Sequence, residues 1–174
     1  ACEQTALSRL SSEALAAASR EEVEGRVAEV LSTTTGAELT GVFALASDGA
    51  SLVLRQGRGW PSAAADLAIP LPAGSILGRA VTSREGLDLA HVSRDALPPL
   101  LRQAGVVDGQ IVPVLDGGAA VGAIGVFSRR QVGLRDAMPF LTAAAGLVAL
   151  SWRRWDAASA LERTHELLAE AGDR

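Results

Sequence analysis

Residues 69–90 and 98–127 decide the fold, with the sequences IPLPAGSILGRAVTSREGLDLA and PPLLRQAGVVDGQIVPVLDGGAAVGAIGVF. Pro70 lacks an amide hydrogen, so the short apolar segment around it predicts a strand at the edge of a sheet. Ser75 can cap the helix that follows, because its hydroxyl can accept a hydrogen bond from a free amide of the first turn. Residues 87–92 are then expected to form a second short strand.

The second half of this stretch predicts a small helix and a hairpin. Residues 98–104 indicate the helix, and a hairpin with strands at residues 110–115 and 120–128 follows it. The second hairpin strand is apolar on both faces, which places it in the middle of the sheet. Gly122 and Gly125 within it are expected to let helices approach closely.

Helical patterns flank this centre on both sides. Apolar residues at helical spacing predict a first helix over residues 3–18 and a long last helix over residues 134–169. Between them, Ser19 and Glu22 match a capping box, in which hydroxyl and carboxylate satisfy free amides at a helix start. The helix that begins there is expected to end near Gly36.

A hairpin and an irregular segment complete the pattern. Residues 41–46 and 51–56 predict two strands, and the Asp48–Gly49 pair between them is a strong hairpin-turn signal. The segment after the second strand contains Trp60 and leads into a variable loop.

Composition excludes several classes of protein. The chain has 174 residues and a net charge of -4, which gives no electrostatic reason to expect a nucleic-acid partner. No run of about 18 apolar residues occurs, so no membrane span is expected. Cys2 is the only cysteine, which excludes an internal disulfide and a cysteine-based metal site. The start at Ala1, without a methionine or a signal-peptide pattern, indicates a fragment of a longer cytoplasmic protein.

Three pieces, LPAGSILGRAVTSREGLDL, LLRQAGVVDGQIVPV and GAAVGAIGVFSRR, resemble the GAF domain, a small-molecule sensing module of bacterial signalling proteins. The resemblance covers nearly the whole chain. It implies an α/β (α+β) fold with a central antiparallel sheet of about five to six strands, helices on both faces and long terminal helices. We divide the chain into N-terminal helices at residues 1–36, a core at 37–150 and a signalling helix or linker at 151–174.

The resemblance also implies a function. Such a domain binds a small molecule and relays its state through terminal helices to an output module, such as a histidine kinase of a two-component system, a diguanylate cyclase or a phosphatase. The alternative is a ligand-free module that only dimerises. No catalytic residues are expected, because the clustered nucleophiles, bases or metal ligands of an enzyme are missing from the sequence.

The cofactor is left unknown. Reductase and bilin-binding relatives rely on cysteines that this chain lacks, and a cyclic-nucleotide signature is matched only at Asp136. Haem is a minor alternative, for which His91 would be the iron ligand.

Five residues are the candidate ligand-binding set: Trp60, Ser75, Arg79, His91 and Gln110. They are expected to converge between the residue 75–83 helix, the end of the strand before His91 and the start of the hairpin. Each has a simpler alternative: Trp60 can be an apolar plug, and His91 can bond to backbone carbonyls.

An anionic ligand is a further possibility for the expected binding site. Arg79 and Arg94 could attract an anionic ligand, although most arginines are solvated surface charges.

Apolar residues of the last helix predict a homodimer. Trp152, Trp155, Leu161 and Leu168 lie at helical spacing beyond the reach of a small domain. The first helix, which carries Leu7, Leu10 and Leu15, is their expected companion across a two-fold axis. The alternative is that the first helix folds back and covers these residues within one chain.

Overall fold

A computed structural model of the chain describes residues 2–61 and 67–173. It contains a six-stranded sheet in the order β3-β2-β1-β6-β5-β4, in which all neighbours are antiparallel. The strands are β1 (Leu39–Leu45), β2 (Ser51–Arg58), β3 (Ala68–Pro70), β4 (Leu87–Asp88), β5 (Asp108–Asp116) and β6 (Ala119–Ser128). The α+β class, the edge position of β3 and the central position of β6 are therefore confirmed.

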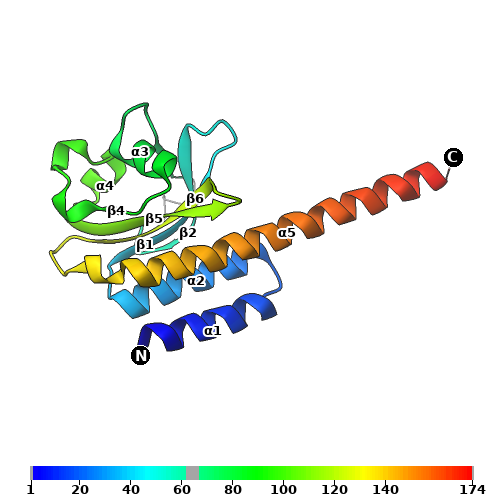
Figure 1. Cartoon of the computed structure of the whole chain (residues 1–174), viewed down its shortest axis with the longest axis horizontal. Helices are drawn as coiled ribbons and strands as arrows, with labels where there is room; N and C mark the ends of the chain where they lie inside the picture. The colour runs from blue at the N-terminus through cyan, green and yellow to red at the C-terminus, as the bar shows by residue number, and fades with distance from the viewer. Residues whose placement is uncertain (1, 62–66, 174) are drawn as a thin grey trace.

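Helices cover both faces of the sheet. The α-helices are α1 (Cys2–Ala16), α2 (Arg20–Thr35), α3 (Ile76–Ser83), α4 (Pro99–Gln103) and α5 (Met138–Gly172). Short 3₁₀ helices are η2 (Leu89–His91), η3 (Arg94–Ala96) and η4 (Leu134–Ala137). Figure 1 shows α2 and the first half of α5 against one face with α1 outside them, and α3 and α4 on the opposite face. This is the predicted layering.

The start and end of α2 follow from local hydrogen bonds. The Glu22 amide donates to the Ser19 hydroxyl at 3.1 Å, and the Ala18 amide donates to the Glu22 carboxylate at 3.0 Å. Gly36 ends the helix with a φ of 71°, a conformation that costs glycine little. The capping box and the helix end are confirmed.

Two local predictions need correction. The strand expected over residues 87–92 stops at Asp88, because the Asp88 carboxylate accepts the Ala90 amide at 3.0 Å and turns the chain into η2. The Asp48–Gly49 pair lies within a longer connection, residues 46–50, and not in a two-residue turn. The variable loop expected after Pro61 falls largely on residues 62–66, outside the described residues.

Gly122 of β6 sets how closely α5 lies on the sheet. A Cβ atom at this position would lie 2.8 Å from the Trp152 ring and would collide with the Phe43 carbonyl oxygen. The expected close helix approach is therefore confirmed at Gly122. At Gly125 the space is taken by the ring of Phe127 instead.

A polar cluster joins the ends of β1 and β6. Glu38, just before β1, accepts hydrogen bonds from the Ser128 hydroxyl at 3.2 Å and from the Arg129 guanidinium at 3.0 Å. The bond from Arg129 is the main reason why the pKa of the Glu38 carboxyl lies below its ordinary value of 4.5. The cluster thus stabilises the fold only while Glu38 is charged.

The segment Leu134–Gly172 is long and apolar enough to cross a membrane by length and composition. Half of its most apolar window is buried inside the domain, where α5 packs on the sheet, α1 and α2. That burial is typical of a core helix, which meets the same length and composition test.

We expect Gly122→Ala to lower the free energy of unfolding by about 2 kcal/mol, because the new methyl group must displace backbone or the Trp152 ring. Gly146→Ala is the control: it lies on the exposed side of α5 with open space around it, and should stabilise by about 0.5–1 kcal/mol. Urea denaturation measures both. Equal effects of the two substitutions would contradict this account of Gly122.

We expect Glu38→Gln to reduce stability in a way that depends on pH. A lowered folded-state pKa means that the Glu38 contribution is fully present above pH 4.5 and disappears as pH falls through the lowered value. The difference between parent and variant should therefore be largest near neutral pH and vanish in acid. Glu162→Gln, on the exposed part of α5, is the control. A difference that stays constant with pH would refute the role of the charge.

Candidate functional site

Trp60 closes one end of the sheet. Its indole nitrogen donates to the Thr40 carbonyl at 2.8 Å, and its ring meets Phe127 edge to face at a centroid distance of 5.8 Å. The side chain is half-buried among the residues under α3 and α4. Its one donor is therefore already used, and its contacts are those of the apolar plug that was the simpler alternative.

Ser75, Arg79 and His91 do not converge on a common point. The Ser75 hydroxyl caps α3 by accepting the Gly78 amide at 3.1 Å. Arg79 and His91 have exposed side chains. Within residues 2–61 and 67–173, no three His, Cys, Asp or Glu side chains gather closely enough to hold a metal ion.

Gln110 lies on the opposite face of the sheet from the one expected. Side chains alternate along a strand, and Gln110 shares its face with Val112 and Val114, which pack under α2 and α5. It is fully buried, and neither its amide nitrogen nor its amide oxygen has a hydrogen-bond partner within the described residues. Alternation in the sequence puts Gln110 on one face with Val112 and Val114, but both faces of β5 are apolar, so only the packing of the helices shows which face this is.

Aromatic side chains fill the centre of the face under α3 and α4. Phe43 and Phe127 are both fully buried. Their rings lie over Gly41 and Gly125, where any larger residue would collide with them. The centre of this face is thus filled by the chain's own aromatic side chains.

The other face carries a charged cluster at the point where α5 leaves the sheet, which we call the exit clamp. The Glu24 carboxylate is buried and accepts hydrogen bonds from Arg20 at 3.1 Å and from Arg55 of β2 at 3.0 Å. The Arg20 guanidinium also lies 4.7 Å above the Trp152 ring and pairs with Asp156 at 3.6 Å. Arg20 therefore links α2 to α5, and Glu24 links α2 to Arg55 of β2.

The electrostatics of the exit clamp are those of a buried carboxylate between two cations. Hydrogen bonds to Glu24 raise the pKa of the Arg55 guanidinium, so this cation stays charged. Removing either cation leaves the buried Glu24 charge less compensated, which is costly in a low-dielectric environment. Arg20 and Glu24 are four residues apart, and this spacing in the sequence was the available signal.

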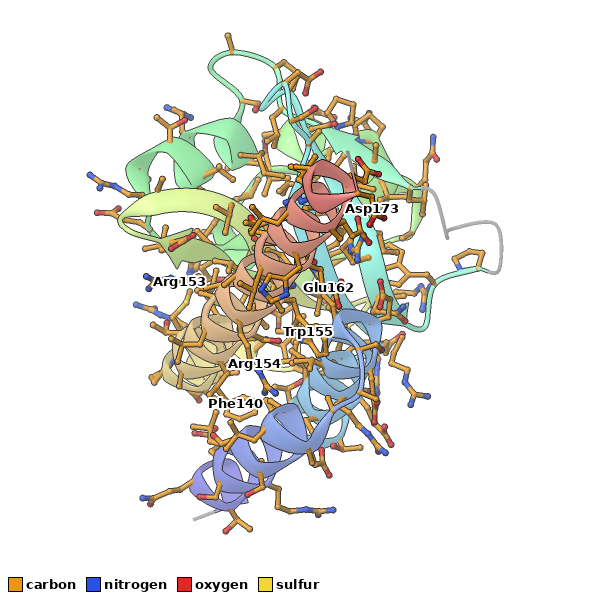
Figure 2. The ribbon with its side chains drawn as sticks, turned by 90° about the vertical axis from the view of Figure 1, so that its right-hand side faces the viewer. Phe140, Arg153, Arg154, Trp155, Glu162 and Asp173 are labelled. Carbon is orange, nitrogen blue, oxygen red and sulfur yellow. The ribbon has the colours of Figure 1, made fainter. Side chains whose placement is uncertain are left out.

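Two further contacts hold α5 at the same level. Arg153 pairs with Asp116 at the end of β5 at 3.3 Å. Arg154 donates a hydrogen bond to the Leu15 carbonyl at 3.5 Å, and its guanidinium lies 5.7 Å from the centre of the Trp155 ring. Figure 2 shows Arg153 on the side of α5 away from Arg154 and Trp155. Trp152 is only 4% exposed, which corrects the expectation that its own domain leaves it uncovered.

Beyond Trp155, α5 is exposed on all sides and projects away from the domain (Figure 1). At 3.6 residues per turn, its side chains separate into two faces. Leu161 and Leu168, which are 58% and 65% exposed, lie on an uncharged face that we call the apolar seam. The rest of the apolar seam is Ala157, Ala158, Ala160, Thr164, His165, Leu167 and Ala171, and the opposite face carries Glu162, Arg163, Glu166 and Glu170.

The chain resembles proteins of one fold family. The GAF domain family matches residues 19–152. Among solved structures, the GAF domain of a phosphoenolpyruvate-protein phosphotransferase from Coxiella burnetii superposes with a TM-score of 0.78 at 18% identity, covering 91% of this chain and 96% of that one. A comparison with curated proteins returned no match.

Two other similar structures come from different proteins. Free methionine-R-sulfoxide reductase from Neisseria meningitidis has a TM-score of 0.73 at 19% identity, with 90% of this chain and 91% of that one covered. Residues 122 to 287 of a methyl-accepting chemotaxis protein have a TM-score of 0.67 at 21% identity, with 83% and 95% covered. At these identities the structures establish the fold alone, and the family match establishes membership. The chain belongs to the GAF domain family, a regulatory and sensory fold of signalling proteins.

Proposed function

We propose that this GAF domain acts as a homodimeric relay, in which the position of α5 carries the state of the domain to an output module. The observation that supports this most strongly is the division of α5 at Trp155 into a half held by the sheet and an exposed half. Residues 156–172 reach about 25 Å at 1.5 Å per residue, which is close to the diameter of a small domain. Along this half, no three His, Asp or Glu side chains gather closely enough to hold a metal ion.

The apolar seam supports a second copy of the chain as the partner. Charged residues occupy only the side away from the seam, which is the pattern of two helices that pack along an uncharged stripe. The α1 helix packs on α2 and on the first half of α5, so it does not cover the seam beyond Trp155. Leu150 and Leu15, at 63% and 74% exposure, are further exposed apolar side chains nearer the domain, and Arg154 lies between them and the seam.

The exit clamp is the coupling element of this proposal. It lies where α5 leaves the sheet, and it connects α5 through Arg20 and Glu24 to Arg55 on strand β2. A shift of β2 would therefore change how Arg20 is shared between Glu24, Trp152 and Asp156. Small changes at such a point are amplified along a rigid helix.

The proposal also concerns the signal that the domain receives and the module that it controls. The aromatic packing of Phe43, Phe127 and Trp60 favours a domain that works mainly through its helices. A small-molecule input therefore needs a place outside that packing. The output module, a kinase, cyclase or phosphatase of a cytoplasmic signalling protein, would follow α5, and the domain itself would perform no catalysis.

We expect the chain to be a dimer at tens of micromolar, and Leu161→Glu to make it monomeric, because the substitution buries a charge in the seam between two copies. Ser159→Glu is the matched control, since Ser159 lies among the charged residues and should leave the dimer intact. Light scattering coupled to size exclusion measures the mass. A monomeric parent chain would refute the proposal.

We expect Arg20→Gln to loosen α5 and to cost about 2 kcal/mol of unfolding free energy, because Glu24 loses one cation and Trp152 loses its stacked guanidinium. Amide hydrogen exchange of residues 148–156 should become faster. Arg58→Gln is the control: it removes only an exposed pair to Glu29 at 3.5 Å. Equal exchange rates in the two variants would show that the exit clamp does not hold α5.

A further inference from the structure

A small cavity lies on the α3 and α4 side of the sheet. It has a volume of about 240 Å³ and opens between η2, η3, α4 and the segment that leads into β5. The residues that line it are Leu89, Ala90, Val92, Arg94, Leu97, Arg102, Gly105, Val106, Val107 and Gln131. None of the five residues expected from the sequence to bind ligand is among them.

The floor of the cavity is apolar. Leu89, Leu97 and Val106 are 2%, 6% and 4% exposed. The floor's backbone amides are already used: the Leu97 amide donates to the Arg94 carbonyl at 3.2 Å, and the Val106 amide donates to the Leu101 carbonyl at 3.1 Å. The floor therefore offers contact surface for hydrocarbon and few unused hydrogen-bonding groups.

The rim is positively charged. Arg94 and Arg102 line it, and within the described residues neither guanidinium group makes a hydrogen bond or an ion pair. By contrast, Arg20, Arg55 and Arg129 are each paired with a carboxylate.

No acidic side chain lines the cavity within the described part of the chain. Asp88 accepts the Ala90 amide, and Asp108 accepts the amides of Val132, Gly133 and Leu134. Asp95, next to Arg94 in η3, is exposed and forms no ion pair with either arginine within the described residues. Nothing at the rim therefore neutralises the two guanidinium groups.

We propose that this cavity binds a small monocarboxylate with a compact apolar body, its carboxylate held by Arg94 and Arg102 and its body on the Leu89, Leu97 and Val106 floor. A guanidinium group presents paired donors that match a carboxylate, and the apolar floor distinguishes such a ligand from a bare anion. The volume of about 240 Å³ suits a small molecule better than a nucleotide or a peptide of several residues. As an input to the relay, the site rests on the proposed function, whereas ligand binding itself does not.

The test uses benzoate as the probe. Calorimetric titration and ligand-detected NMR measure its binding to the whole chain. We expect saturable binding of benzoate, and much weaker binding of benzamide, which has the same shape without the charge, and of inorganic phosphate, which lacks the apolar body. Arg102→Gln and Arg94→Gln should each weaken benzoate binding about tenfold. Arg79→Gln, an exposed arginine on α3 outside the cavity, is the matched control and should change nothing.

A second variant fills the cavity without touching the charges. Ala90→Phe should abolish benzoate binding while leaving thermal unfolding cooperative. Equal binding of benzamide and benzoate, equal loss in the Arg79 variant, or unchanged binding in the Arg94 and Arg102 variants would each overturn the proposal. Benzoate binding that survives in a monomeric parent chain would support the site and refute the relay, so the two failures are distinguishable.

Discussion

The contact between the Trp152 indole and the backbone of β6 at Gly122 is the constraint on which the rest of the structure depends. A side chain at Gly122 would keep α5 away from the sheet. With glycine there, the indole lies directly on the central strand, and the α5 residues before it bury one face of the sheet together with α2. The contact also defines where burial along α5 stops, and so where the exposed half begins.

The exit clamp is placed by that contact. The Trp152 ring is the surface on which the Arg20 guanidinium stacks, and Arg20 in turn helps to compensate the buried charge of Glu24. Arg55 completes this compensation from strand β2. A change in the packing of the sheet against α5 is therefore coupled to a change in buried electrostatics, which is energetically steeper than a change in apolar contacts alone.

The two faces of the sheet differ in how well their polar groups are satisfied. On the α5 side, both amide atoms of Gln110, the Ser151 hydroxyl and the indole nitrogens of Trp152 and Trp155 are buried without partners within the described residues. Each such group costs about 1–3 kcal/mol relative to a bonded one. A displacement of α5 that gave these groups partners would recover part of that cost. Under the proposed relay, this gain would favour a second position of α5.

The sequence by itself determined the α+β class, the caps at Ser19 and Ser75, the edge position of Pro70 and the central position of β6, because each depends on neighbouring residues or on the period of apolar residues. It did not determine the candidate site. The face of Gln110, the use of the Trp60 donor by Thr40, the burial of Trp152 and the cavity beside Arg94 and Arg102 depend on which distant segments meet. Only the tertiary structure decided these features, since hydrogen-bond partners and burial are set by packing between elements rather than by the order of residues along the chain.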